Sequence, residues 1–336
     1  MKEREEMGSI LVTGGAGYIG SHAVLALRDA GFAPVVLDDL STGFRQAVPA
    51  DVPFVQGSVG DEDLMAETML RHGVSAVMHF AAFQIVPESV EQPLEYWRNN
   101  VGGVAATLGA CLRSGVRHLV FSSTAAVYGI PETLPVPEDA PCDPITPYGS
   151  SKHAAERMIL DVARAFGLST VTLRYFNVAG ADPAGRAGQR SHQATHLIKV
   201  ACEVATGKRD KVEIFGTDYP TPDGTGVRDY VHVSDLADAH VAALRHILRN
   251  PVNLTMNCGY GWGYSVRDVL TAVERVNGAP LPVVESPRRA GDPPSLVAAV
   301  DRLQRTLDWR PRYEALDFII RSALDWETVL AAETLP

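Results

Sequence analysis

Tyr148 and Lys152 are the residues whose types and spacing point most directly to chemistry. They open a run with the pattern of a helix over residues 148–166. Positions i and i+4 lie on one face of a helix, one turn apart, so the phenol and the ammonium are expected to be neighbours. A nearby positive charge favours phenolate and lowers the pKa of tyrosine, so Tyr148 could act as a base near neutral pH. The same spacing is common on solvated helix faces, so the surrounding elements must decide the role of the pair.

A glycine-rich segment near the N-terminus has the spacing of a dinucleotide-binding turn. An apolar run at residues 9–13 leads into Gly14, Gly17 and Gly20, and a helical pattern follows over 23–30. The first glycine permits a tight turn, the second lets the backbone approach a pyrophosphate, and the third lets helix and strand pack closely. The free N–H groups and the positive dipole end of the helix suit the phosphates.

An acid after the second expected strand indicates which dinucleotide binds. The strand covers residues 34–37 and is followed by Asp38 and Asp39. A carboxylate there accepts hydrogen bonds from a ribose 2′,3′-diol and repels a 2′-phosphate, which favours NAD over NADP. The polar turn at residues 40–43 is expected to reach the same ribose.

Strands and helices alternate through the first half of the chain. Further strands are expected at residues 52–56, 74–80, 118–123 and 169–175, and further helices at 62–72, 96–114 and 148–166. The alternation predicts an α/β fold with a Rossmann-type doubly wound parallel sheet. Ligands bind such sheets at the carboxyl ends of the strands, where Gly14, Asp38, Ala81, Thr124 and Phe176 fall.

The second half of the chain differs in composition, with loops rich in Gly, Pro and polar residues between shorter elements. Helices are expected at residues 195–206, 235–249, 266–277, 301–307 and 313–332, and strands at 212–215 and 253–257. We therefore expect an NAD-binding Rossmann domain made of residues 8–176 and 232–260. A smaller, discontinuous α/β substrate-binding domain would consist of residues 177–231 and 261–336.

Composition excludes several classes of protein. The 336 residues carry a net charge of −10, which argues against a nucleic-acid-binding protein. Residues 1–7 are too charged for a signal peptide, and no apolar run is long enough to span a membrane. The four cysteines are far apart and lack metal spacing, which favours free thiols in a reducing cytoplasm and predicts no metal site.

Several segments together resemble the extended short-chain dehydrogenase/reductase family. They are the three spaced glycines, Asp38, the run 122–124, and the Tyr148/Lys152 pair. Within that family the chain is similar to the UDP-sugar 4-epimerases along nearly its whole length, and residues 223–230 are the most specific stretch.

The resemblance implies an isomerase that inverts C4 of a UDP-hexose. It would interconvert UDP-glucose and UDP-galactose through a 4-keto intermediate, with NAD retained. Tyr148 would be the acid/base, Thr124 would bind the C4 hydroxyl and relay its proton, and Lys152 would bind the nicotinamide ribose. A homodimer through the helices near residues 96–113 and 151–166 is also implied.

The resemblance assigns further residues to each ligand. The cofactor-binding positions are Gly14, Gly17, Tyr18, Ile19, Gly20, Asp38, Asp39, Ser41, Thr42, Gly43, Ser58, Val59, Phe80, Ala81, Ala82, Gln84, Asn99, Ser122, Tyr148, Lys152 and Tyr175. The substrate-binding positions are Thr124, Tyr148, Phe176, Asn177, His196, Leu197, Glu213, Ile214, Phe215, Arg228, Arg289 and Asp292. Among them, Arg228 and Arg289 would clamp the diphosphate with their forked cationic donors.

Three positions depart from the family pattern. Ser58 stands where an aspartate usually contacts adenine, and Gln84 stands where some members have a lysine. Leu296 replaces a tyrosine that narrows the sugar pocket in some members, which suggests room for an N-acetylated sugar.

Three alternatives remain. The first is a 4-epimerase for another UDP-sugar, such as an N-acetylhexosamine, a pentose or a uronate. The second is a nucleotide-sugar 4,6-dehydratase, which the run Thr124-Ala125-Ala126 disfavours because it lacks the two acids needed for elimination. The third is a non-catalytic NAD-binding protein.

Overall fold

The computed structural model describes residues 8–191, 194–289 and 291–333. Residues 1–7, on which the expectation of no signal peptide rests, lie outside the described part of the chain. Within that part, no helix is both long and apolar enough to cross a membrane.

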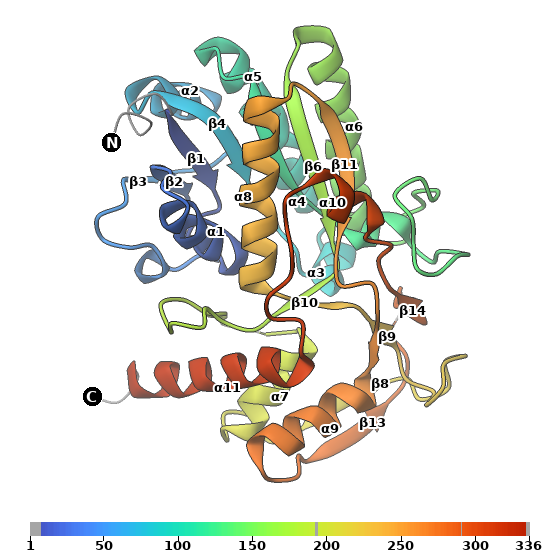
Figure 1. Cartoon of the computed structure of the whole chain (residues 1–336). Coiled ribbons are helices and arrows are strands. Elements are labelled where there is room, and N and C mark those ends of the chain that lie inside the picture. Colours follow the sequence, from blue (N-terminus) through green and yellow to red (C-terminus); the bar gives the residue numbers. More distant parts are fainter. Residues whose placement is uncertain (1–7, 192–193, 290, 334–336) are drawn as a thin grey trace.

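A sheet of seven parallel strands forms the centre of the upper part of the molecule (Figure 1). Its spatial order is β11-β6-β5-β4-β1-β2-β3. The strands are β1 (Ser9–Thr13), β2 (Pro34–Asp38), β3 (Phe54–Gln56), β4 (Val74–His79), β5 (His118–Thr124), β6 (Ser169–Tyr175) and β11 (Asn253–Cys258). The expected doubly wound sheet is therefore confirmed.

The strand register brings the loops that follow β1, β2 and β4 to one edge of the sheet. Thr13 at the end of β1 pairs with Leu37 of β2 on one side and with His79 of β4 on the other. The residues that follow, Gly14, Asp38 and Phe80, therefore leave the sheet side by side. Parallel strands buried on both faces need nearly continuous apolar runs, which these sequences supply.

Helices cover both faces of the sheet, as expected for a doubly wound fold. One face packs on α1 (Tyr18–Asp29) and α8 (Val233–Arg249). The other packs on α2 (Glu62–Arg71), α5 (Gly103–Ser114) and α6 (Pro147–Phe166). Alternate strand residues point to opposite faces, so Ile10 and Val12 join the first core while Leu11 joins the second.

The helix expected over residues 96–114 is interrupted. After α3 (Val86–Glu91) and α4 (Pro93–Tyr96) comes a π-helical turn, η3 (Trp97–Gly102), before α5 begins. Asn100 lies in this turn; its side chain accepts a hydrogen bond from Phe83 N (2.8 Å) and donates one to Phe83 O (3.0 Å). The wider turn thus fixes the segment that follows β4. π-Turns are often found at functional sites.

The lower part of the molecule is built from small sheets and helices (Figure 1). Its helices are α7 (Leu197–Ala205), α9 (Val266–Asn277) and α11 (Leu316–Glu333). Helix α10 (Asp301–Thr306) lies higher, beside β11 (Figure 1), and 3-10 turns occur elsewhere at η2 (Arg45–Ala47) and η4 (Ala125–Tyr128). The strands of the lower part are β7 (Asn177–Ala179), β8 (Val212–Phe215), β9 (Val227–Arg228), β10 (Tyr230–His232), β12 (Tyr264–Ser265), β13 (Val283–Ser286) and β14 (Ser295–Leu296). Only β8 among these strands was expected from the sequence.

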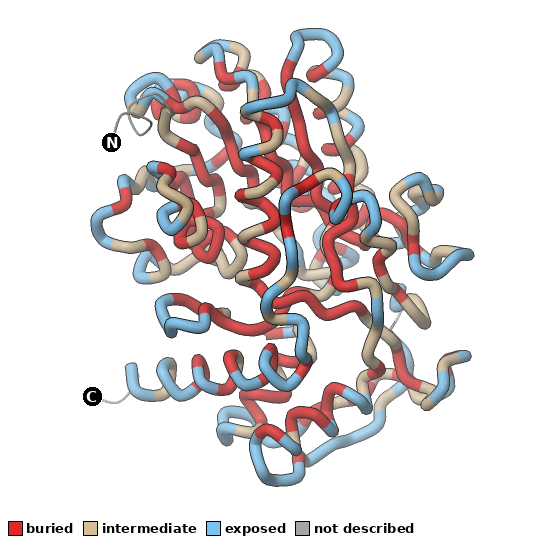
Figure 2. The backbone as a smooth tube through the Cα atoms, in the orientation of Figure 1, coloured by how far each residue is buried: buried red, intermediate tan, exposed pale blue. Residues whose placement is uncertain are grey.

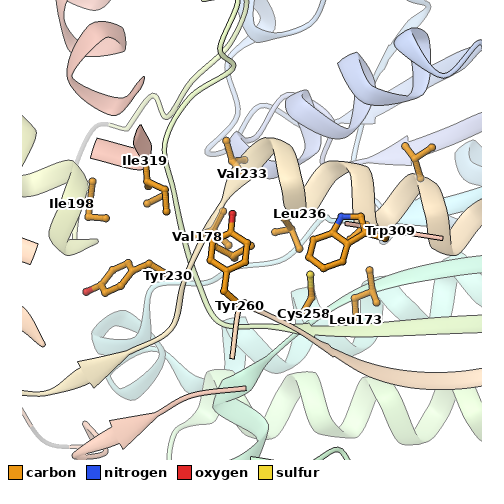
Figure 3. Packing of buried hydrophobic residues seen from close by; sticks show 14 of the residues in the cluster. Leu173, Val178, Ile198, Tyr230, Val233, Leu236, Cys258, Tyr260, Trp309 and Ile319 are labelled. Atoms are coloured by element: carbon orange, nitrogen blue, oxygen red, sulfur yellow. The ribbon is translucent and has the colours of Figure 1, made fainter. Parts of the chain in front are cut away.

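One hydrophobic cluster runs through both parts of the molecule. It joins Leu173 of β6 and Leu236 of α8 to Ile198 of α7 and Ile319 of α11 (Figure 3). Figure 2 shows buried backbone continuing from the sheet into the inner sides of the lower helices. The predicted domain boundaries stay a prediction, but α8 and β11 do pack against the main sheet.

Candidate active site

The turn between β1 and α1 is shaped by its glycines. Gly14 has a φ of 68°, and a Cβ there would lie 2.6 Å from Ala81 N. A Cβ on Gly20 would lie 2.1 Å from Gly14 O, so no other residue fits. No side chain caps the N-terminus of α1, which leaves its first N–H groups for a ligand.

Asp38 stabilises the same turn from the end of β2. Its carboxylate accepts hydrogen bonds from Ala16 N (2.9 Å) and Leu40 N (2.8 Å). Burial raises the pKa of Asp38, and these two hydrogen bonds oppose that shift. The carboxylate therefore sits beside the glycine turn with acceptor capacity left for a ribose hydroxyl.

An open cleft lies at this edge of the sheet. Sixteen of the predicted cofactor positions line it: Gly14, Gly17, Tyr18, Ile19, Gly20, Asp38, Asp39, Ser41, Thr42, Val59, Phe80, Ala81, Ala82, Gln84, Asn99 and Tyr175. Leu37, Gly57 and Phe83 also line it and were not predicted. Leu37 and Gly57 lie at the ends of β2 and β3, so the rule that placed Gly14 could have found them.

Five predicted cofactor positions do not line the cleft. Gly43 lies just behind it, because a Cβ there would be 2.9 Å from Asp38 Oδ1. Ser58 Oγ accepts a hydrogen bond from Gly60 N (3.1 Å), so it is engaged within its own turn. Ser122 Oγ donates to Tyr175 OH (3.1 Å), which does line the cleft. The other two are Tyr148 and Lys152.

Tyr148 is brought to Thr124 by the start of α6. Thr146 caps that helix by accepting a hydrogen bond from Gly149 N (3.2 Å), and Tyr148 follows in the first turn, 7% exposed. The β5–β6 register pairs Thr124 with Tyr175. The phenol of Tyr148 lies close enough to Thr124 and to Tyr175 for both to influence its pKa. Three hydroxyl groups thus meet beyond the end of the cleft.

The protonation of the Tyr148/Lys152 pair differs from the expectation. Burial raises the pKa of Tyr148 well above its usual value, and Thr124 only partly opposes this. Burial also lowers the pKa of Lys152 to about 7, although Glu156 acts to raise it. Lysine alone therefore does not depress the tyrosine pKa, because desolvation disfavours both charged forms. The Lys152 ammonium lies over the Phe121 ring, 4.4 Å from its centroid.

A second group of predicted residues gathers in the lower part. Arg228 on β9 pairs with Asp292 at 3.6 Å, and its side chain is 15% exposed. The Arg289 guanidinium lies over the Phe215 ring at 3.6 Å. Strand β8 alternates, so Phe215 can face this group while the Ile214 side chain is buried in the core.

The remaining substrate positions are more dispersed. Asn177, His196 and Leu197 line a second, narrow cavity beside α11. Glu213 pairs with Lys211 at 3.2 Å, and Phe176 packs in a buried cluster with Leu296. Ile214 could contribute only its backbone.

All four cysteines lie in the described part of the chain. Cys111, Cys142, Cys202 and Cys258 are all free, and three of them are buried. Within the described ranges, no group of three or more His, Cys, Asp or Glu residues could hold a metal ion.

Together, the parallel sheet, the glycine turn and the acid after β2 define a dinucleotide-binding protein of the Rossmann type. The NAD dependent epimerase/dehydratase family matches residues 10–259, and the chain belongs to that family.

Individual relatives cover nearly the whole chain. The UDP-glucose 4-epimerase of Azospirillum brasilense is 58% identical over 96% of this chain and 92% of its own length. The crystal structure of UDP-glucose 4-epimerase from Brucella ovis with NAD superposes with a TM-score of 0.92 at 46% identity, covering 95% of this chain and 98% of that one. The UDP-Glc/GlcNAc 4-epimerase of Campylobacter jejuni gives a TM-score of 0.83 at 42% identity, covering 96% and 99%.

Proposed function

We propose that this protein is a UDP-glucose 4-epimerase, which interconverts UDP-glucose and UDP-galactose by inverting C4. The observation that carries the proposal is the meeting of Tyr148 with Thr124 at the end of a cleft shaped by Gly14 and Gly20. The homologous enzymes from A. brasilense and B. ovis have the same named activity.

The cleft fits NAD. Its glycine turn leaves no room for a Cβ at Gly14 or Gly20, so backbone N–H groups can approach a pyrophosphate closely. Asp38 would accept hydrogen bonds from the adenosine ribose, and its charge disfavours a 2′-phosphate. Tyr175 and Asn99 line the part of the cleft that would hold the nicotinamide end. A bound NAD would supply reversible hydride transfer at C4 of the sugar, so the reaction would involve no net oxidation.

Tyr148 is the proposed acid/base. Its phenol would remove the proton of the C4 hydroxyl during oxidation and return one during reduction, while Thr124 binds that hydroxyl and relays the proton. Both residues are buried, so water is kept away from the reacting carbon. Lys152 would bind the nicotinamide ribose and provide the positive charge that a buried phenolate requires.

The lower group of residues is proposed to hold the UDP moiety. Arg228 and Arg289 would clamp the diphosphate, and Asp292 would bind the uridine ribose. Phe215, already stacked on Arg289, would lie beside the nucleotide with Glu213 and the Ile214 backbone. With UDP anchored there, the keto sugar can turn about the diphosphate and present either face to the same Tyr148.

A second substrate class is favoured by Leu296. Leu296 packs in a cluster with Phe176, and a leucine in place of tyrosine there would leave more room for an N-acetyl group. UDP-N-acetylglucosamine is therefore a second candidate substrate. A 4,6-dehydratase remains disfavoured, because Ala125 and Ala126 follow Thr124 and carry no acid.

We further propose a cytoplasmic homodimer. The predicted contact uses the helices near residues 96–113 and 151–166, and exposed Leu94, Trp97 and Phe166 at the ends of this region support it. The free cysteines suit a reducing compartment. Sedimentation of the purified protein tests the assembly, and a monomer at micromolar concentration would contradict it.

Incubation with a panel of UDP-hexoses, UDP-pentoses and N-acetylated forms, followed by chromatography, tests the activity. Purified protein should carry NAD and convert UDP-galactose without added cofactor. Bound NAD with no epimerisation of any UDP-sugar would support the non-catalytic alternative instead.

A further inference from the structure

The carboxylate of Glu156 joins three elements of the candidate active site. Glu156 lies on α6, one turn beyond Lys152 and two turns beyond Tyr148, and is 3% exposed. It accepts a hydrogen bond from Ser123 Oγ on β5. It also pairs bidentately with Arg174 on β6, through Nε at 3.0 Å and a terminal nitrogen at 2.6 Å.

Each partner of Glu156 directly adjoins a proposed site residue. Ser123 precedes Thr124, and Arg174 precedes Tyr175. Arg174 continues the network by donating to Tyr128 OH (3.0 Å), which donates to Asn257 Oδ1 (2.7 Å) on β11. One buried carboxylate thus sets the relative position of the three elements that carry Thr124, Tyr148 and Tyr175.

Two basic side chains lie near Glu156. Arg174 pairs directly with its carboxylate, Lys152 lies one helical turn away on α6, and all three side chains are buried. The other groups nearby are Ser123 of β5, Tyr128, and Glu138 and Cys142 of the loop before α6. On the far side of Lys152 lie His79 of β4 and the Phe121 ring. Glu156 is the charged group that raises the pKa of Lys152 against burial.

We propose that Glu156 is a positioning residue for the epimerisation reaction: its carboxylate holds α6 to the ends of β5 and β6 and places a negative charge one helical turn from Lys152. This inference rests on the proposed function, because it concerns the same acid/base pair. Glu156 does not touch the substrate. It acts through Lys152, and through Ser123 and Arg174, which fix the backbone next to Thr124 and Tyr175.

Lysine NMR tests the electrostatic half of this proposal without any substrate. The chain has five lysines, Lys2, Lys152, Lys199, Lys208 and Lys211, so the Cε signals of 13C-lysine-labelled protein can be assigned with a Lys152→Met variant. Glu156→Gln should move the Lys152 titration to lower pH by about one unit or more, the usual effect of losing an opposite charge. Glu156→Asp retains the charge and should restore most of the shift. Ser123→Ala should leave the titration unchanged.

Kinetics test the catalytic half. In Glu156→Gln, kcat for UDP-galactose should fall roughly tenfold or more, because small misplacements of acid/base groups are costly. In the pH profile of kcat for this variant, the decline at alkaline pH should begin about one pH unit lower than in the parent. KM and the amount of bound NAD should stay near the parent values. An unchanged Lys152 titration, or a uniform loss of kcat with an unmoved pH profile, would overturn the proposal.

A variant without an unpaired charge guards against misfolding. Glu156→Gln alone leaves Arg174 buried without its carboxylate, whereas Glu156→Gln with Arg174→Gln removes both charges. The double variant should show a lower Lys152 titration than Arg174→Gln alone, and equal titrations in these two variants overturn the proposal. If the parent protein has no epimerase activity, the proposed function is wrong. The lysine titration needs no turnover, so it tests the role of Glu156 separately from the proposed function.

Discussion

The hydroxyl of Tyr18 donates a 2.6 Å hydrogen bond to the carbonyl oxygen of Gly180. Tyr18 is the first residue of α1 and lines the proposed NAD cleft, whereas Gly180 follows β7 and lines the second cavity with Asn177. Burial raises the pKa of Tyr18, which keeps the phenol a donor. The bond therefore ties the cofactor turn to the segment that leads into the proposed substrate site.

Tyr18→Phe should loosen that connection. The substitution removes the donor and leaves a carbonyl oxygen unsatisfied, which costs about 1–3 kcal/mol. We expect the free energy of unfolding to decrease by that amount, as measured by urea denaturation. We also expect faster loss of NAD, as measured by the NAD content after dialysis. Tyr260→Phe removes a buried hydroxyl that donates to Asp235 (2.6 Å) and does not line the cleft, so it serves as the matched control. Equal NAD loss in both variants would contradict the specific role of Tyr18.

Tyr148→Phe tests the acid/base assignment. Phenylalanine keeps the ring and loses only the proton-carrying oxygen, so kcat should fall by roughly 10²–10⁴-fold while NAD remains bound. Conversion of UDP-galactose is followed by chromatography, and cofactor content by absorbance after denaturation. Near-normal turnover by the purified variant would show that another group transfers the proton.

Glycine substitutions test the shape of the cofactor turn. In Gly20→Ala the new Cβ would lie 2.1 Å from Gly14 O, a backbone atom that cannot move aside cheaply. We expect loss of bound NAD and destabilisation by several kcal/mol, of the order seen for overpacking and strain. Gly102→Ala is the control, because nothing lies within 4 Å of its Cβ and its backbone is helical. That change should be neutral or stabilise by about 0.4–1 kcal/mol; similar damage from both variants would contradict the steric reason.

Much of the cleft was predictable because parallel strands place their carboxyl ends at one edge. Once β1, β2 and β4 are recognised, Gly14, Asp38 and Ala81 must lie together, whatever the side chains around them. The lower sheets were not predictable in this way. β9, β12 and β14 have two residues each, too few for any alternating pattern, and they exist because distant loops pair.

Other features depend on contacts that a linear sequence does not reveal. The π-turn at η3 accompanies the bonds of Asn100 to Phe83, seventeen residues away. The expectation of a low tyrosine pKa was wrong because burial, a tertiary property, outweighs the i, i+4 lysine. The Glu156–Arg174 pair likewise needs the packing of α6 on β6.

Four buried histidines predict a loss of stability in acid. Burial lowers the pKa of His79 and His232 to about 3 and that of His22 and His240 to about 4. In the unfolded chain the histidine pKa is higher, near 6.5. The free energy of unfolding is therefore unaffected by these groups well above pH 6.5, and it declines as the pH falls from 6.5 towards the pKa values of the folded protein. Each should cost roughly 2 kcal/mol of unfolding free energy between pH 7 and pH 5.

Urea denaturation at a series of pH values measures this decline. Asp229 opposes it in part, since burial raises its pKa to about 6 and its contribution to stability is therefore lost as the pH rises from about 4 towards 6. His240→Leu removes one titrating group and should make the pH dependence shallower by about one proton. An unchanged slope would mean that His240 is protonated in the folded protein.

Leu296 is the residue expected to control the size of the accepted sugar. It is 7% exposed on β14 and packs in the cluster that contains Phe176 and Tyr128. In Leu296→Tyr a larger ring must occupy the space available to an N-acetyl group. Turnover of UDP-N-acetylglucosamine should therefore fall at least roughly tenfold, the steric discrimination expected from a few heavy atoms, while that of UDP-glucose changes little.

Leu296→Met is the control for the pocket itself. It conserves volume, should cost less than about 1.5 kcal/mol of stability, and should leave the ratio of the two activities unchanged. Both substrates are assayed at the same enzyme concentrations, so that the ratio and not the absolute rate is compared. If the parent protein fails to turn over UDP-N-acetylglucosamine at levels that convert UDP-glucose, the space beside Leu296 is filled by other side chains. Specificity would then depend on Phe176 and its neighbours, because they form the remaining wall of that cluster.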